Sequence, residues 1–147
     1  MTRKFVFALI LAVFGLVVSL PAQAVDFTVV NQKTISWAPV TKTTEGNDIP
    51  AGDTIKYQVW LVQDQAAKDT AIKVGPELDV TSYTITFTAE GRWLVGVEAI
   101  RIPAASTDDV RRAPITWSDS DDTALVPAPF GFIYFEAPAQ VGGLGPS

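Results

Sequence analysis

Histidine and cysteine are absent from the chain, and methionine occurs only once. Their absence excludes a zinc or haem site built on these residues, a cysteine nucleophile and a Ser/His/Asp triad. It also excludes disulfides and thiol-linked lipid anchors. Basic residues are few as well, with 11 Lys and Arg against 16 Asp and Glu. This balance argues against a protein that neutralises phosphates, so we expect no nucleic-acid partner and no cofactor.

The first 24 residues have the layout of a secretory signal peptide. Arg3 and Lys4 precede an uncharged apolar run over 5–20, and Pro-Ala-Gln-Ala at 21–24 places small residues three and one before a cleavage point. The apolar run is shorter than the roughly 20 residues that a bilayer requires. We therefore expect cleavage after Ala24, no stable membrane anchor afterwards, and a secreted or periplasmic protein.

The chain after residue 24 has the composition of one ordinary soluble domain. Removing the leader takes away two basic residues and no acidic one, so the net charge changes from −5 to −7. The remainder contains 13 Val, 9 Ile and 14 Thr but only 5 Leu, a balance that favours strands over helices. We therefore expect an all-β domain.

Alternation of apolar and polar residues marks seven expected strands, separated by segments rich in Pro, Gly, Asn and Asp. The longest of these connections are expected over 39–54 and 101–114. Seven strands at this spacing predict a sandwich of two sheets. The expected strands cover 27–30, 34–38, 55–62, 71–74, 81–87, 93–100 and part of 115–126.

Four of these segments resemble a fibronectin type III domain in their order and spacing. They are Ile-Ser-Trp-Ala-Pro at 35–39, Ile-Lys-Tyr-Gln-Val at 55–59, Thr-Ser-Tyr-Thr-Ile-Thr at 81–86, and the alternating stretch 93–99. The resemblance covers residues 25–126 and implies a seven-stranded fibronectin type III, or immunoglobulin-like, β-sandwich. The core that the resemblance implies consists of Trp37, Tyr57, Val59, Trp93, Val95, Val97 and Ala99.

One position departs from the family's pattern. The strand that begins at residue 93 is usually entered through a tyrosine, whose hydroxyl bonds to the backbone at a corner of the fold. Trp93 stands there instead, and its indole offers an N–H donor but no hydroxyl. The family implies protein or carbohydrate contacts without naming a ligand, because function is added to such a fold at individual sites.

Strand alternation also predicts an apolar patch on the face that points away from the core. If Tyr57 and Val95 point inward, their neighbours along the same strands point outward. Three interpretations remain open: the C-terminal segment covers the patch, a partner protein or second copy docks on it, or Trp60 stacks against a sugar ring. The expected ligand-binding residues are Trp60, Val62, Leu94 and Ile100.

Residues 127–147 form an aromatic segment followed by a Pro/Gly-rich tail. As a strand the segment 130–135 is apolar on both faces, with Ile133 and Phe135 on the second one, so exposure would create an aggregation hazard. It is expected either to pack on its own domain as an eighth strand or to be donated to a neighbouring molecule. The candidate partner-contact residues are Phe130, Phe132 and Tyr134.

Carboxylates are the only acid/base groups left for catalysis. Asp108 with Asp109, and Asp119 with Asp121, are close pairs on expected loops, but a small sandwich supplies no cleft for them. The run 119–122 lacks the Gly and the distal Glu of an EF-hand, which leaves at most a weak calcium site at a strand end. We expect no catalytic residue and no dedicated metal site.

These observations predict an exported, non-catalytic binding or spacer module. It would contact a protein or a surface glycan at the cell envelope or outside the cell, or associate with itself. The first alternative is a structural subunit that assembles through the aromatic segment 130–135. The alternative from another class is a carbohydrate-active enzyme.

Overall fold

The computed structural model describes residues 23–137 and contains strands, one short 3₁₀ turn and no α-helix in that part of the chain. The all-β prediction is therefore confirmed. The elements are β1 (Asp26–Val29), β2 (Gln32–Ser36), β3 (Thr54–Gln63), η1 (Lys68–Thr70), β4 (Ile72–Leu78), β5 (Ser82–Thr86), β6 (Gly91–Ile102), β7 (Arg111–Arg112), β8 (Thr116–Trp117) and β9 (Phe130–Tyr134).

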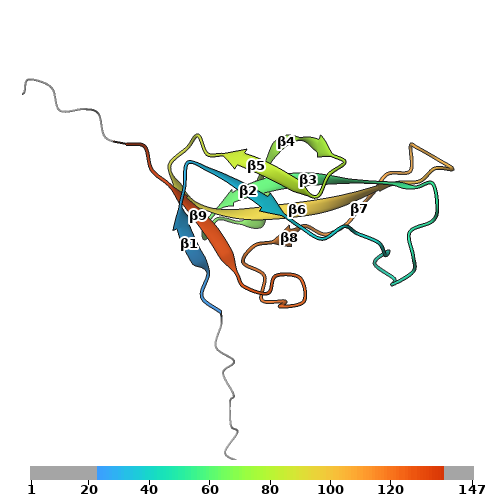
Figure 1. Ribbon diagram of the computed structural model, residues 1–147, viewed down its shortest axis with the longest axis horizontal. Helices are drawn as coiled ribbons and strands as arrows, with labels where there is room; N and C mark the ends of the chain where they lie inside the picture. The colour runs from blue at the N-terminus through green and yellow to red at the C-terminus, as the bar shows by residue number, and fades with distance from the viewer. Residues whose placement is uncertain (1–22, 138–147) are drawn as a thin grey trace, which may run out of the picture.

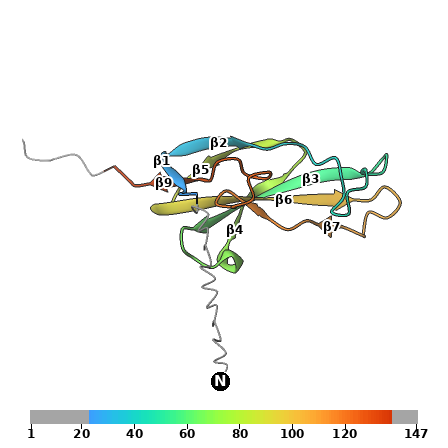
Figure 2. The same ribbon diagram turned by 90° about the horizontal axis from the view of Figure 1, so that it is seen from below.

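The strands form a large mixed sheet and a small antiparallel one (Figure 1). The large sheet has the order β1-β9-β6-β3-β4, with β7 and β8 also paired to β6, and it is mixed because β1 runs parallel to β9. The small sheet contains only β2 and β5. Seen from below, β2 and β5 lie on one side of the large sheet, and η1 lies on the opposite side (Figure 2).

The hydrophobic core lies between the two sheets. The small sheet contributes Ile35 and Ile85, and the large sheet contributes alternate residues of β3 and β6 together with Phe132 of β9. The core residues expected on β3 and β6 are confirmed, because Tyr57, Val59, Trp93 and Val95 are buried. Trp37 and Val97 pack against this cluster in a half-buried state, and Ala99 is half-buried farther along β6.

Trp93 bonds to the backbone at the corner between β5 and β6. Its indole Nε1 donates a 3.0 Å hydrogen bond to the carbonyl oxygen of Ala89, four residues upstream. A tyrosine hydroxyl makes a comparable backbone contact at the equivalent corner of many sandwich domains. The indole N–H therefore ties the turn to the strand without a hydroxyl.

The last predicted strand corresponds to the short β8, and segments before and after it, β7 and β9, also pair with β6. β7 pairs with Ile100 and Arg101, β8 pairs with Gly96 and Val97, and β9 pairs with the start of β6. The strand expected within 115–126 is therefore present, but it covers only Thr116 and Trp117. Pro127 and Pro129 follow in the chain, and a proline has no N–H to donate to a ladder.

Ser118 connects β8 to β9 along the edge of β6. Its hydroxyl accepts a 3.0 Å hydrogen bond from the N–H of Val95, and its own N–H donates to the Val95 carbonyl at 2.7 Å. The Ser118 carbonyl then accepts from the N–H of Phe130 at 2.9 Å. The sheet thus continues past residue 126 into β9, which pairs with β6.

The edge strand β4 extends beyond Gly75 and Pro76, where it was expected to end. An irregularity in its pairing lies opposite Gln58, whose side-chain amide donates to the carbonyls of Val59, Val74 and Gly75 at 3.0–3.4 Å. Gly75 has a φ of +70°, and a Cβ there would lie 2.3 Å from the hydroxyl oxygen of Tyr83. Only glycine combines that backbone conformation with so close an approach to β5.

Candidate functional site

The outer face of β3 and β6 is not the open apolar patch that alternation predicts. Val62, Leu94 and Ile100 expose only 2%, 3% and 0% of their surface, and Trp60 is half-buried. The two interpretations that need an open patch therefore lose their basis, whereas a covered patch was the third one left open. The reason is that segments outside β3 and β6 place side chains on this face.

Two of those segments are η1 and β8. The Trp117 ring of β8 lies over Gly96, because a Cβ on that glycine would be 2.9 Å from two of the ring carbons. The ammonium of Lys68 in η1 lies 4.7 Å from the centre of the same ring and 2.8 Å from the Asp119 carboxylate. The turn before β4 is thus fastened to the segment after β8 across the sheet.

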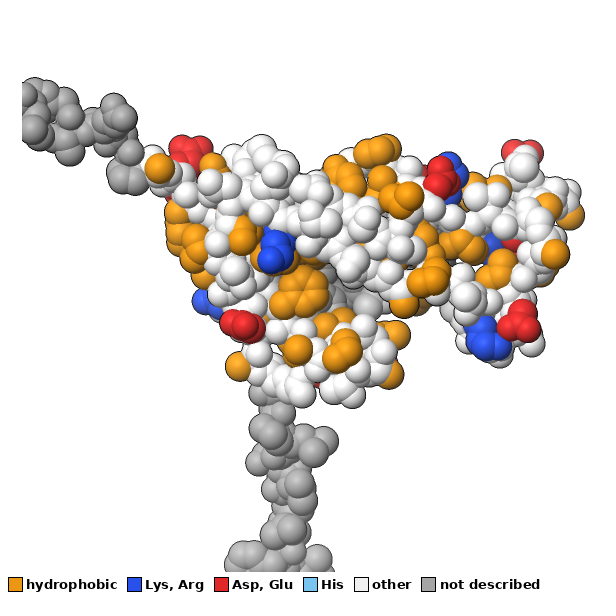
Figure 3. Space-filling view, in the orientation of Figure 1, with side chains coloured by type: hydrophobic (Ala, Val, Ile, Leu, Met, Phe, Trp, Pro, Cys, Tyr) orange, Lys and Arg blue, Asp and Glu red, His pale blue; other side chains and the backbone are white. Residues whose placement is uncertain are grey.

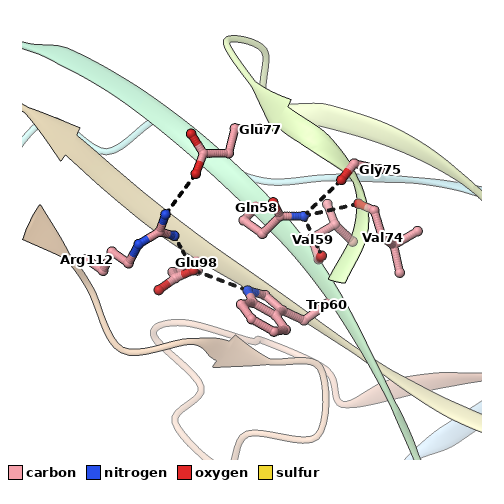
Figure 4. Close-up of polar contacts among 8 residues, drawn as sticks. All are labelled: Gln58, Val59, Trp60, Val74, Gly75, Glu77, Glu98 and Arg112. Carbon is pink, nitrogen blue, oxygen red and sulfur yellow. Dashed lines mark hydrogen bonds and ion pairs between the residues drawn. The ribbon is translucent and has the colours of Figure 1, made fainter. Parts of the chain in front are cut away.

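Trp60 belongs to a polar network on this face (Figure 4). Its Nε1 donates to the Glu98 carboxylate at 3.3 Å, and Arg112 bridges Glu98 and Glu77 at 3.0 and 2.8 Å. The hydrogen bond to Glu77, followed by the charge of Glu98, raises the pKa of the Arg112 guanidinium.

The Trp60 ring is also occupied on one side by a cation. The Lys73 ammonium lies 5.3 Å from the ring centre, within the range of a cation–π contact. Trp60 therefore uses both its N–H and its ring within the domain. The side chain is engaged in holding β3, β4 and β6 together, rather than standing free as a stacking platform.

The candidate partner-contact residues of β9 point into their own domain. Phe132 is buried and lies 5.6 Å from the Phe87 ring, while Phe130 and Tyr134 pack against the same core. The structure thus places this segment as a strand of its own sheet. On the opposite face of this segment, Ile133 is half-buried and Phe135 exposes 60% of its surface.

The acidic residues singled out from the sequence lie on separate loops, where Asp108, Asp109 and Asp121 are exposed and Asp119 is half-buried. Asp109 pairs with Arg111 at 2.7 Å, and Asp119 pairs with Lys68. The Asp122 side chain accepts the N–H of Ala124 within its own turn. Across residues 23–137, no three Asp or Glu side chains gather in a group that could hold a metal ion.

Asp53 has the most perturbed carboxyl group in this region. The backbone N–H of Ala104, followed by the Arg101 guanidinium, lowers its pKa below the ordinary value of 3.8. Arg101 Nε lies 2.6 Å from the carboxylate, which therefore ties the start of β3 to the end of β6.

We expect Asp53→Asn to make the free energy of unfolding less dependent on pH in acid. A carboxyl whose pKa is lowered by folding stabilises the protein above its ordinary pKa, and this contribution is lost as the pH falls through the folded-state value. The variant should therefore be less stable than the parent at pH 7, and the two should converge below about pH 4. Urea unfolding between pH 2 and 7 measures this, and a constant difference would contradict it.

An apolar hollow lies between the two sheets, beside β2. It has a volume of about 440 Å³, and we call it the seam cavity. Its walls come from the end of β2, from β3 and β6, and from the 113–118 and 124–130 segments. The hollow between the sheets and the loop leading to β9 is visible with hydrophobic side chains on its floor (Figure 3). Its lining includes Trp37, Tyr57, Val97, Leu125, Val126 and Phe130.

Aromatic side chains fix the shape of the seam cavity. Trp37 and Tyr57 pack edge to face with ring centres 5.4 Å apart, and the Tyr57 hydroxyl accepts the N–H of Val40 at 2.9 Å. Trp37 directly follows β2 of the small sheet, and Tyr57 lies on β3 of the large sheet. The cavity is therefore largely preformed, as is usual for binding sites.

A second hollow of about 590 Å³ adjoins the first and is polar. The two share Val40, Ala99 and Ala113 in their walls. The basic groups of this polar cavity are already paired, with Lys42 2.8 Å from Asp48 and Arg111 2.7 Å from Asp109.

Two buried side-chain atoms in the described chain lack a hydrogen-bond partner, namely Trp37 Nε1 and Thr43 Oγ1. Trp37 lines the seam cavity, and Thr43 lines the polar cavity. An unsatisfied buried donor or acceptor costs about 1–3 kcal/mol, so such groups usually mark a place where a partner belongs. Both are therefore candidates for contact with a ligand.

Sequence reasoning did not find this site. It placed Trp37 and Tyr57 in the core and expected the last strand somewhere within 115–126. Pro127 and Pro129 were the available signal, because a proline has no N–H for a ladder and the segment just before β9 therefore cannot pair continuously with β6.

Among residues 23–137 there is no helix long and apolar enough to cross a bilayer. Comparisons of the chain with models of protein families, with curated proteins and with solved structures found no significant match.

Proposed function

We propose that the protein is an exported, non-catalytic binding module, and that the seam cavity takes an apolar group from a protein ligand. The observation that carries the proposal is a preformed apolar cavity of about 440 Å³ whose wall contains an unpartnered indole N–H. Ligand sites typically combine such an apolar lining with a few polar groups that orient the ligand. The leader-like residues 1–24 support a site of action at the cell envelope or outside the cell.

We also propose that the domain is a variant of the fibronectin type III arrangement. Support comes from the two packed sheets, the inward Trp37 and Tyr57, and the corner bond of Trp93. The variant features are the parallel contact of β1 with β9 and the pairing of β7, β8 and β9 in turn with β6. Together they leave the small sheet with only two strands, and this opens the seam.

A protein ligand is favoured over a glycan by the state of the aromatic residues. The indole predicted as a sugar platform, Trp60, is engaged by Glu98 and Lys73. The seam cavity offers apolar walls with few polar groups, whereas a sugar presents many hydroxyls that need partners. Catalysis is disfavoured because Asp109 and Asp119 are held in ion pairs and neither of them lines the cavity.

Binding of N-phenyl-1-naphthylamine, an uncharged dye whose fluorescence rises in apolar sites, tests the proposal. We expect saturable binding at one site, and we expect Val97→Phe, which fills the cavity, to weaken it at least tenfold. Val110→Phe is the matched control, because Val110 is exposed and does not line the cavity. Absence of saturable binding, or equal binding to both variants, would overturn the assignment of the site.

A further inference from the structure

β2 has a free edge beside the seam cavity. It pairs only with β5, and the N–H of Trp37 donates to Thr81 while the carbonyl of Asn31 accepts from Phe87. In an antiparallel ladder the residues that bond to a neighbour alternate. Residues 31, 33, 35 and 37 therefore bond toward β5, and the backbone groups of Gln32, Thr34 and Ser36 point away from it.

Those outward-pointing groups have no backbone partner among the described residues. No hydrogen bond of residues 23–137 engages the N–H or the carbonyl of Gln32, Thr34 or Ser36. The side chain of Thr34 is turned to the outer face of the small sheet, where it bonds to Thr84 at 2.8 Å. A row of free donors and acceptors at this spacing matches the edge of another strand.

The end of β2 also forms part of the cavity wall. Ile35, Ser36, Trp37 and Ala38 all line it, so a strand lying against this edge would run along the mouth of the cavity. Because side chains alternate along a strand, every second residue of the added strand would point inward. The unpartnered Nε1 of Trp37 then lies beside a chain that carries a carbonyl at each residue.

The charge of Lys33 indicates which kind of residue the added strand carries at one end. Lys33 lies on the same side of β2 as Ile35, and it has no ion pair among the described residues, unlike Lys42, Arg101 and Arg111 near the adjoining polar cavity. An acidic residue of the ligand next to Lys33 would supply the missing partner. The groups flanking the rest of the seam are already neutralised, which favours uncharged residues there.

We propose that the seam cavity binds an extended peptide segment of a partner protein, which adds as a strand to the free edge of β2. Apolar side chains at alternate positions enter the cavity, and an acidic side chain follows them toward Lys33. This inference rests on the proposed function and names its ligand class. In strand addition the main-chain hydrogen bonds supply affinity, and the pockets for alternate side chains supply specificity.

The probe is the peptide acetyl-Glu-Thr-Val-Thr-Leu-Thr-Val-Thr-Glu-amide, whose pattern is nearly the same in both directions. Isothermal titration calorimetry should detect binding, and a peptide of the same composition without alternation should bind at least tenfold more weakly. Two further peptides carry N-methyl groups, one on the threonine amides and one on the valine and leucine amides. Strand addition uses one edge of the peptide, so one of these two should lose binding at least tenfold and the other should retain it.

Thr34→Pro tests the edge of β2 on the protein side. Proline is tolerated on an edge strand where the N–H faces outward, so the ladder with β5 should survive. Its matched control, Thr34→Ala, removes the same side-chain hydrogen bond but keeps the N–H. We expect peptide binding to fall at least tenfold in Thr34→Pro and to be unchanged in Thr34→Ala, with circular dichroism showing that both variants are folded.

Other results separate this inference from the proposed function. If the naphthylamine dye binds and Val97→Phe blocks it, but both N-methylated peptides bind equally or both fail, strand addition is overturned and the apolar site stands. If sedimentation shows a dimer that Thr34→Pro dissociates, the occupant is a second copy and the partner assignment is overturned. Peptide binding that appears only after deletion of residues 138–147 would likewise assign the edge to the chain's own tail.

Discussion

Replacing Ile85 by alanine is expected to lower the free energy of unfolding by about 3–4 kcal/mol, the range for deleting a fully buried aliphatic side chain. Ile85 exposes none of its surface and lies on β5, in the core cluster shared by both sheets. The small sheet is joined to the large one mainly by such contacts, since β2 and β5 pair only with each other. A cavity at Ile85 therefore weakens the packing that holds the two sheets together.

Ile72→Ala is the matched control for this experiment. The substitution removes the same atoms from a residue on the edge strand β4, but 55% of the Ile72 surface is exposed. Its replacement should alter stability by no more than about 0.5 kcal/mol. Guanidinium unfolding followed by tryptophan fluorescence compares the two variants, and equal losses would contradict the assignment of Ile85 to the core between the sheets.

Gly96→Ala is expected to cost about 2–3 kcal/mol, although alanine is otherwise a small change. A Cβ on residue 96 would lie 2.5 Å from Cγ2 of Ile115 and 2.9 Å from two carbons of the Trp117 ring. The backbone at Gly96 has no positive φ, so the cost comes from crowding and not from conformation. The added methyl group must push the β8 region away from β6.

A double-mutant cycle with Ile115→Ala isolates that contact. Removing Cγ2 of Ile115 makes room on one side, so the additional cost of Gly96→Ala in this background should fall to about half, a coupling within the range for residues in contact. Thermal and denaturant unfolding of the four proteins gives the coupling. Simple additivity would contradict the crowding that the geometry implies at β8.

Local alternation predicted the strands and their inward faces well. The pattern in 55–62 and 93–100 placed Tyr57, Val59 and Val95 in the core, where they lie. The predicted strands 55–62 and 93–100 fall within β3 and β6, which extend a few residues further at both ends. This part of the fold could be predicted because the alternation of apolar and polar residues along a strand depends only on that strand's own sequence.

The outward faces were less predictable for a physical reason. Whether an outward residue is exposed depends on which distant segments reach that face, and Lys68 and Asp119, which join η1 to the segment after β8, are 51 residues apart in the chain. Glu98 shows the same effect, since its carboxylate is buried only because Trp60 and Arg112 donate to it. Hydrophobic pattern alone carries no information about such long-range cover.

The candidate binding site was the least predictable feature. Its aromatic wall residues, Trp37 and Tyr57, were expected in the core, and the cavity exists because the chain after β8 leaves β6 and returns only at β9. The free edge of β2 arises in the same way, since β1 pairs with β9 and not with β2. Both the cavity and the free edge of β2 therefore depend on which distant segments pair with each other.

The sequence by itself determined the all-β class, the inward face of each long strand and the exclusion of His- and Cys-based chemistry. Only the tertiary structure decided which outward residues are covered, where the last strand breaks and which side of the sandwich stays open. The physical reason is that strand formation and facing follow from local period and propensity, whereas cover, pairing and cavities depend on which distant segments meet.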